Sequence, residues 1–465
     1  MSKVSQGARK QDSDIALEVK SWLSLRIYVE RHGKGNSMLT LADNALITQT
    51  GPGTPMGQLF RRFWQPVLLS SDLPESDGEP QRIKVLGEKL VAYRDSNGDI
   101  GVMDYYCPHR RAGMFFGRNE ECGLRCVYHG WKFDKNGNCT DMPSEPTESN
   151  FKDKVKITAY PAKEAGTVVW VYMGPPELQP ELPQFEWCTV PDGHQVVTRW
   201  LQQSNYLQAM EGEIDTSHVS FNHRWFDLNP APANIRSLNQ MATDGSPRLT
   251  VRETESGFIY GSRRDYDNQY YWRCTQLMVP MYSLIPGNSW PRGGRGWVPV
   301  DDEHNMVFQY ACNPERPLTE QEILQRKTQS PQNLHKVKFS LPDGYVIDTW
   351  IPERTPQNDY NIDREMQRTV NYVGIPSTRE QDMAMTDSMG AIADRTKEHL
   401  GTSDTAIIAG RQLLLKLARD LQEGQEPFAA QHPEVFAVRA INVVDPEPDF
   451  DKLLEKYGDM GKVNV

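Results

Sequence analysis

Several features that would assign this 465-residue chain to a broad class are missing from it. No apolar run approaches the ~18 residues that a membrane-spanning helix needs. Basic residues are outnumbered, because 51 lysines and arginines stand against 62 acidic residues and leave a net charge of -11. A surface that binds nucleic acid needs a basic excess. The sequence therefore predicts neither a membrane protein nor a nucleic-acid-binding one.

Two further patterns are absent. The N-terminus lacks the basic stretch and apolar core of a secretory signal, and the seven cysteines are odd in number and widely spaced, which favours a reducing, cytoplasmic location. No G-x-G-x-x-G or other nucleotide-binding fingerprint occurs. The sequence therefore predicts no dinucleotide-binding domain within this chain.

The chain does contain two short stretches rich in metal ligands, and the first combines thiols with imidazoles. Cys107 and His109 form C-x-H, sixteen residues follow, and Cys126 and His129 form C-x2-H. Such a set can hold a tetrahedral zinc ion, or a [2Fe-2S] cluster with two thiolates on one iron and two imidazoles on the other. Structural zinc sites usually group like ligands, whereas each loop here supplies one Cys and one His. The order favours the cluster and leaves zinc as the alternative.

The second stretch contains Asp215, His218 and His223 in the pattern D-x2-H-x4-H. Two imidazoles and a carboxylate form the facial triad of non-haem iron(II) oxygenases, although two ordinary histidines would produce the same pattern. Residues five apart on a helix point roughly 140° away from each other. We therefore expect the helix to end or bulge between the two histidines, around residues 220–222.

Short strands and tight turns dominate the region around the first motif. Expected strands at 89–93 and 100–103 flank the Asn97-Gly98 pair, and residues 132–133 precede Asn136-Gly137. Asn-Gly pairs are strong hairpin signals. Together with a strand at 166–172, this predicts a small antiparallel β domain that carries both ligand loops.

After a proline-rich linker at 175–183, strands and helices are mixed. Strands are expected at 257–260, 270–285 and 306–310, capping boxes at 319–322 and 377–380, and a long helix at 405–421. The predicted class is α+β, with a small all-β domain and a larger domain in which helices flank an antiparallel sheet. The expected division is 1–37 (an extension with a helix at 14–30), 38–59 (a leading segment), 60–178 (the β domain), 179–440 (the larger domain) and 441–465 (a tail).

Together, the two motifs resemble those of the catalytic subunits of Rieske non-haem iron ring-hydroxylating oxygenases. The second half is similar to the phthalate dioxygenase-like branch of that family. The matching stretches are Glu211-Gly212 ahead of Asp215, residues 358–365 (NDYNIDRE), and residues 380–390, from Glu380-Gln381-Asp382 to Ser388-Met389-Gly390. The resemblance covers about residues 38–440.

This resemblance implies a role for each motif residue. Cys107, His109, Cys126 and His129 would hold a Rieske [2Fe-2S] cluster. His218 and His223 would hold a mononuclear iron(II) with a third, downstream acid, for which Asp359 matches best and Asp363 is the reserve. Asp215 would hydrogen-bond to His218 and reach His129 of a neighbouring subunit, because such enzymes form head-to-tail trimers, alone or stacked.

The implied function is aromatic hydroxylation with O2, using electrons from an NAD(P)H-dependent reductase that carries a flavin and/or a ferredoxin centre. The branch suggests a phthalate-type aromatic carboxylate and cis-dihydroxylation. The alternatives are a monooxygenase that demethylates at O or N or cleaves aryl ethers, and a non-catalytic iron-sulfur electron carrier. Arg263, Arg264 and Arg273 could clamp a carboxylate, or they could be solvated charges on strand edges.

Overall fold

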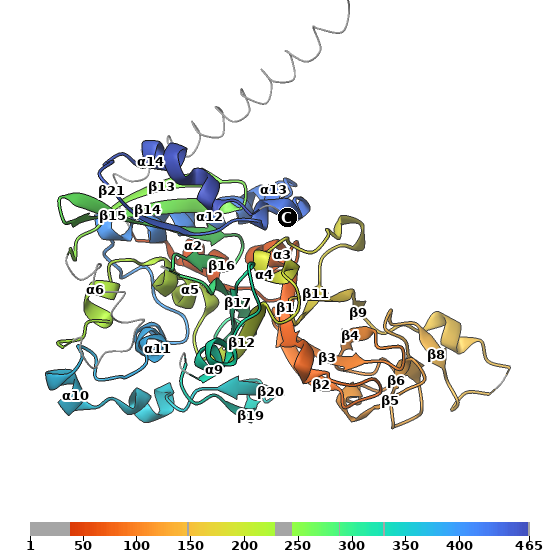
Figure 1. Ribbon diagram of the computed structural model, residues 1–465. Helices are drawn as coiled ribbons and strands as arrows, with labels where there is room; N and C mark the ends of the chain where they lie inside the picture. The colour runs from red at the N-terminus through yellow and green to blue at the C-terminus, as the bar shows by residue number, and fades with distance from the viewer. Residues whose placement is uncertain (1–37, 147, 228–243, 288, 329–330, 464–465) are drawn as a thin grey trace, which may run out of the picture.

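The computed structural model describes residues 38–146, 148–227, 244–287, 289–328 and 331–463. The predicted α+β class is confirmed, since a β-rich region lies beside a larger region of sheets and helices (Figure 1). No helix in the described part of the chain is long and apolar enough to cross a membrane. The helix expected at 14–30 lies outside the described residues.

The smaller region contains two four-stranded antiparallel sheets, which meet the prediction of a β domain. Gly98 and Gly137 adopt positive φ angles of 84° and 79° in the two hairpin turns, a conformation that glycine reaches without strain. One sheet has the order β2 (Gln81–Val85), β3 (Glu88–Arg94), β4 (Ile100–Asp104), β9 (Ala159–Tyr160), and the other the order β5 (Arg118–Glu120), β6 (Gly123–Arg125), β7 (Lys132–Phe133), β8 (Cys139–Asp141).

A third sheet joins the β domain to the rest of the molecule. Its order is β1 (Trp64–Leu69), β11 (Val168–Tyr172), β10 (Ala162–Ala165). All five residues of β11 are buried, as expected for an apolar strand covered on both faces. In Figure 1 this sheet lies between the two regions.

The larger region is built on one antiparallel sheet, in which β21 also pairs with β15. Residues 441–463, in the segment expected as a separate tail, thus belong to this domain. The helix after β21, α14 (Phe450–Tyr457), stacks Phe450 on Trp272 with 5.5 Å between ring centroids. The sheet order is β12 (Gln195–Gln202), β18 (Asn305–Cys312), β17 (Arg292–Pro299), β16 (Tyr282–Ile285), β15 (Gln269–Met278), β14 (Gly257–Tyr266), β13 (Arg248–Thr254), with β21 at Ile441–Asp445.

Three helices determine where the second motif lies. Helix α5 (Tyr206–Ile214) packs on β17, and α11 (Thr378–Ser388) and α12 (Thr405–Gln422) both pack on α5. The helix predicted at 405–421 is therefore confirmed. The remaining elements named below are α2 (Leu41–Thr48), α3 (Pro55–Phe60), the four-residue α6 (Val219–Asn222), α9 (Glu320–Thr328), the pair β19–β20 (His335–Ser340 and Val346–Ile351), the 3-10 helix η5 (Pro356–Asn361) and α10 (Arg364–Thr369).

The two predicted capping boxes differ in outcome. At α9 the box forms, because the Glu322 N–H donates to Thr319 Oγ1 at 3.2 Å and the Thr319 N–H donates to Glu322 Oε2 at 2.8 Å. Ser377 does precede α11, but its side chain accepts no capping hydrogen bond from the helix backbone. The sequence pattern therefore predicted the start of both helices correctly, but the capping box forms in only one of them.

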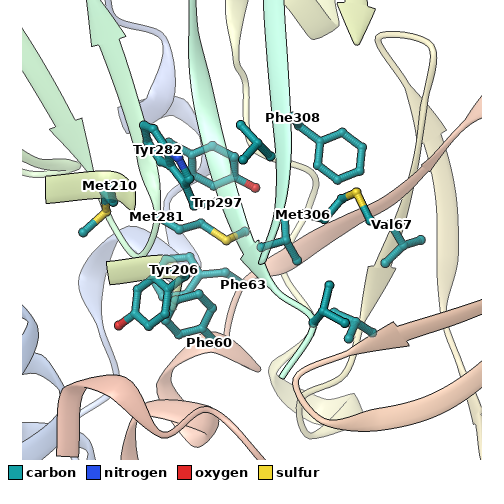
Figure 2. Close-up of a cluster of buried hydrophobic side chains, with 14 of the residues drawn as sticks. Phe60, Phe63, Val67, Tyr206, Met210, Met281, Tyr282, Trp297, Met306 and Phe308 are labelled. Atoms are coloured by element: carbon teal, nitrogen blue, oxygen red, sulfur yellow. The ribbon is translucent and has the colours of Figure 1, made fainter. Parts of the chain in front are cut away.

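One hydrophobic core continues across the boundary between the two regions. Figure 2 shows Phe60, the last residue of α3, beside Tyr206 of α5, with Phe63 and Met210 in the same cluster. The Phe60 and Tyr206 rings meet edge to face at 4.9 Å, and the Tyr206 hydroxyl donates to the Ile47 carbonyl at 2.7 Å. Because α5 leads directly into the second motif, this core provides a rigid mount for it.

Candidate metal centres and active-site cavity

The four residues of the first motif lie in two adjacent loops of the β domain. Cys107 and His109 follow β4, and Cys126 and His129 follow β6. Both cysteines are buried free thiols, and the two imidazole rings approach to 4.4 Å between centroids. A hydrogen bond between the two sulfurs raises the pKa of Cys107 and lowers that of Cys126 to about 6. The structure therefore brings all four predicted ligands together.

The side chains fit a two-iron cluster better than a single metal ion. The Nδ1 atom of His109 is buried and makes no hydrogen bond, which is costly unless a ligand such as a metal occupies the position. A tetrahedral zinc would hold its ligand atoms about 3.3–3.8 Å apart. Among the described residues, only the second motif gathers three or more such atoms within 4.8 Å of one another. The four ligands of the first motif are more widely spread, as a pair of irons requires.

Both loops are held by their own backbone and by an aromatic ring. The Cys107 N–H donates to the Ala112 carbonyl at 2.9 Å, and the Cys126 N–H donates to the Trp131 carbonyl at 2.8 Å. The Trp131 indole stacks on His109 with 4.2 Å between centroids and 10° between planes. This packing orients the His109 imidazole.

Both histidines of the second motif flank one very short helix, which ends before His223 and so allows the two side chains to share one metal. Helix α5 ends at Ile214, and Asp215 is extended, with φ -77° and ψ 110°. His218 directly precedes the short α6, and His223 directly follows it with φ -101° and ψ 15°. A regular helix through His223 is therefore absent, as predicted. Helix α6 ends at Asn222, within the expected interval 220–222, and the structure adds a second interruption upstream, at residues 215–217.

His218 and His223 meet Asp382, which α11 contributes. The distance from Asp382 Oδ1 is 3.0 Å to His223 Nε2 and 3.4 Å to His218 Nε2, and the two Nε2 atoms are 3.3 Å apart. Two imidazole nitrogens and one carboxylate oxygen that converge in this way form the ligand set of a facial triad.

The structure corrects the choice of the third acid. Asp359 is exposed in the left-handed turn of η5, with φ 49°, and does not reach the histidines. Asp363 caps α10, where its Oδ1 accepts two backbone N–H groups, and Asp348 pairs with Arg82 and Lys338. Asp382, and not Asp359, is the carboxylate that lies beside the two histidines. The one sequence signal that included it was the 380–390 stretch of the family resemblance.

Neighbouring side chains orient the triad. Gln381 Oε1 accepts from His223 Nδ1 at 2.7 Å, while the Gln381 amide nitrogen donates to the Ile375 carbonyl at 2.6 Å and so fixes which atom faces the ring. With its Nδ1 proton engaged, His223 presents Nε2 as a ligand. Asp215 Oδ2 faces His218 Nδ1 at 3.7 Å. The predicted neighbour relation between Asp215 and His218 is therefore present in the structure.

The electrostatics of this site favour a cation. Burial would lower the pKa of His218, but the carboxylates of Asp215 and Asp382 raise it to about 10. Burial would likewise raise the pKa of Asp382, yet His223 and Arg379 hold it well below its usual range. The negative charge that stabilises a proton on His218 would equally stabilise a divalent metal ion in the proton's place. The residues thus fit an iron(II) ion.

A cavity of about 280 Å³ opens beside the triad. This volume exceeds the ~150 Å³ cavity that accommodates benzene in another protein. Aromatic rings and guanidinium groups share its walls, so it suits an anionic aromatic molecule. The lining residues include His218, His223, Asp382, Tyr260, Tyr271, Tyr310, Gln309, Arg273, Arg292, Arg295, Arg326 and Arg379.

Of the three arginines suggested by the sequence, only Arg273 lines this cavity. Arg264 is buried and donates to the Thr216 carbonyl at 2.7 Å, so it braces the chain just after Asp215. Arg263 lies over the Tyr270 ring at 4.5 Å, away from the cavity. Sequence reasoning missed the other cavity arginines, because nothing in the local pattern distinguishes them from surface charges.

Comparisons with known proteins agree with this geometry. The Rieske [2Fe-2S] domain family matches residues 63–161, and the family described as LigXa C-terminal domain like matches residues 171–456. The 3-chlorobenzoate-3,4-dioxygenase oxygenase subunit of Comamonas testosteroni is 40% identical over 82% of this chain and 89% of its own length. The phthalate 4,5-dioxygenase oxygenase subunit of Pseudomonas putida is 39% identical over 83% and 88%.

A third relative, the 5,5'-dehydrodivanillate O-demethylase oxygenase subunit of a Sphingobium strain, is 31% identical over 88% of this chain and 87% of its own length. Among solved structures, Pseudomonas putida CBB5 NdmA with caffeine superposes with a TM-score of 0.58 at 17% identity, over 85% of this chain and 100% of that one. That likeness supports the fold. The chain belongs to the Rieske non-haem iron ring-hydroxylating oxygenases, in the phthalate dioxygenase-like branch, as an oxygenase subunit with a Rieske [2Fe-2S] domain and a non-haem iron domain.

Proposed function

We propose that this oxygenase hydroxylates an aromatic carboxylate of the phthalate type by cis-dihydroxylation. The observation that carries the proposal is the convergence of His218, His223 and Asp382 at the wall of a cavity that five arginines and three tyrosines also line. The two relatives near 40% identity are named for 3-chlorobenzoate and phthalate, both aromatic carboxylates.

The residues of this chain would divide the work. Cavity arginines other than Arg295 and Arg379, which both pair with Glu213, would bind the carboxylate of the substrate, and the tyrosines would pack against its ring and exclude water. When bound, the Rieske cluster supplies single electrons and the mononuclear iron activates O2. Gln381 would keep His223 in the tautomer whose Nε2 can bind the metal, and Asp215 would orient the His218 ring through its Nδ1.

A second candidate reaction has its own support. The relative at 31% identity is named as an O-demethylase, and its match covers 88% of this chain. Monooxygenation with demethylation or aryl-ether cleavage therefore remains the alternative for the same site. Product analysis distinguishes the two, because dihydroxylation retains every carbon of the substrate and demethylation releases one.

We further propose that the subunits assemble head to tail as trimers, alone or stacked. Exposed apolar side chains occur at both motifs: Val127 and Tyr128, each 56% exposed, lie between Cys126 and His129, and Phe221, whose ring contacts that of exposed Tyr372, lies between His218 and His223. In Figure 1 the β5–β8 sheet and α6 lie on opposite sides of the molecule. A head-to-tail contact would cover one patch with the other and bring His129 to the neighbour's Asp215.

Electrons would come from a separate NAD(P)H-dependent reductase with a flavin and/or a ferredoxin centre. A structural neighbour, the carbazole 1,9a-dioxygenase oxygenase in complex with its ferredoxin, supports a partner of this kind, with a TM-score of 0.51 at 18% identity. The cytoplasmic location expected from the sequence stays a prediction.

A matched pair of variants tests the metal assignment. Asp382→Ala should retain the visible absorbance of the cluster but lose the third iron and the turnover of substrate, because one of three ligands is gone. Asp359→Ala should keep all three irons, because Asp359 is exposed and remote from the triad. Iron content and absorbance measure both outcomes. If Asp359→Ala lost the third iron and Asp382→Ala kept it, the assignment of Asp382 as the third ligand would be contradicted.

A further inference from the structure

We propose that Arg379 is a positioning residue for Asp382 and that Glu213 holds Arg379 in place. This inference rests on the metal site proposed above and concerns two residues that lie behind it. Arg379 Nη1 lies 3.2 Å from Asp382 Oδ2, and Arg379 Nη2 lies 2.9 Å from Glu213 Oε2. One guanidinium thus bridges the proposed metal ligand and a second, buried carboxylate.

The contacts distinguish the two oxygens of Asp382. Oδ1 faces both imidazoles, at 3.0 Å from His223 Nε2 and 3.4 Å from His218 Nε2, and also accepts from the Asn222 amide at 3.1 Å. Oδ2 is the oxygen that Arg379 binds. Arg379 therefore fixes the rotation of the carboxylate and keeps Oδ1 directed at the two histidines.

Glu213 is itself fixed from two sides. Its side chain is only 2% exposed, and its other oxygen, Oε1, accepts from Arg295. Arg295 is in turn anchored on β18, where its Nε donates to Gln309 Oε1 at 2.9 Å. The network joins α5, α11 and the central strands β17 and β18, so the position of Arg379 follows from the rigid sheet.

The charges of this network balance. Arg295 and Arg379 carry two positive charges, and Glu213 and Asp382 carry two negative ones. Buried charges need such compensation. Neutralising Glu213 would leave an uncompensated cation beside the metal site, which would oppose the binding of a divalent ion.

Two variants weaken this arrangement for different reasons. Glu213→Gln removes the compensating charge and releases Arg379. Arg379→Lys keeps the positive charge, but an ammonium group lacks the planar geometry with which a guanidinium binds Asp382 and Glu213 through two separate nitrogens. Changes to groups that orient metal ligands typically lower metal affinity by about 10–100-fold. We expect a loss in that range for each variant.

The experiment uses the full chain with its cluster intact and oxidised, and with the mononuclear iron removed. Cobalt(II) is titrated into the protein in competition with a chelator, and the bound ion is observed by EPR. In the wild type we expect one site, which His223→Ala abolishes. In Glu213→Gln and Arg379→Lys we expect weaker binding by about 10–100-fold and an altered EPR spectrum, which a general loss of stability would not produce.

Arg61→Lys is the matched control, because Arg61 and Glu88 form another largely buried Arg–Glu pair, at 2.6 Å and away from the triad. It should leave the cobalt(II) affinity and spectrum unchanged. Wild-type affinity and spectrum in either Glu213→Gln or Arg379→Lys, with the cluster absorbance retained, would overturn the inference. Equal cobalt(II) binding by the wild type and His223→Ala would instead refute the metal site itself.

Discussion

Replacement of Glu211 by glutamine should destabilise the catalytic domain by about 3–5 kcal/mol, the cost of leaving a buried charge without its partner. Glu211 lies on α5, four residues before Asp215. Its carboxylate accepts from Arg411 Nε at 2.6 Å and from Arg395 Nη2 at 2.9 Å. These contacts join α5 to α12 and to the segment that follows α11.

The magnitude follows from the burial of the two arginines, whose side chains are 0% (Arg395) and 4% (Arg411) exposed. After the substitution, Arg411 would keep its contact with Glu398 at 2.6 Å. Within the described part of the chain, Arg395 would retain two neutral acceptors, Asn44 Oδ1 at 3.2 Å and the Ala393 carbonyl at 3.4 Å. Neutral acceptors offset the desolvation of a guanidinium poorly.

The assay is denaturant unfolding followed by far-UV circular dichroism, on protein that retains its cluster absorbance. Asp420→Asn is the control on the same helix, because the Lys416–Asp420 pair is exposed, with 48% of the lysine side chain accessible. Loss of this exposed ion pair should lower the free energy of unfolding by about 0.5 kcal/mol or less. A cost of less than about 1 kcal/mol for Glu211→Gln would refute the reasoning from buried charge.

Two other predictions concern residues near the triad. Asp215→Asn should leave both metals bound but lower turnover by at least roughly 10-fold, because the group that orients His218 loses its charge; iron content together with turnover measures this, and wild-type activity would refute the role. Burial raises the pKa of Glu380 to about 7, against the opposing effect of Arg354. Because this pKa lies above that of the unfolded chain, ionisation costs stability, and the contribution of Glu380 should fall as the pH rises from about 4.5 to 7. Glu380→Gln should flatten that part of the profile when unfolding is measured between pH 5 and 8, and an unchanged profile would contradict the pKa shift.

The parts of the molecule that were predictable from the sequence are local. Cys107 to His129 lie within one short stretch, and the Asn-Gly turns around them form the expected hairpins. Ligand order alone favoured a cluster over zinc, and the spread of the four ligands in the structure agrees with that choice. Spacing also predicted that no regular helix could run through both His218 and His223.

What the sequence could not supply depends on tertiary packing. Asp382 reaches the histidines only because α11 packs against α5. Asp359 was the better match by motif, yet its turn buries Tyr360, whose hydroxyl donates to Asp387 of α11, and leaves Asp359 in solvent. The same limit applies to residues 441–445, whose pairing with β15 links strands far apart in the chain.

The most direct test of the proposed hydroxylation of an aromatic carboxylate is a reaction of the reduced protein with labelled oxygen. The purified chain, with its cluster reduced chemically, is mixed with 18O2 and with 3-chlorobenzoate, phthalate and methoxylated benzoates in turn, and the products are analysed by mass spectrometry. We expect an 18O-labelled hydroxylated product from at least one aromatic carboxylate, and none with Asp382→Ala. Absence of labelled product from every aromatic acid, with both metal sites filled, would contradict the proposal.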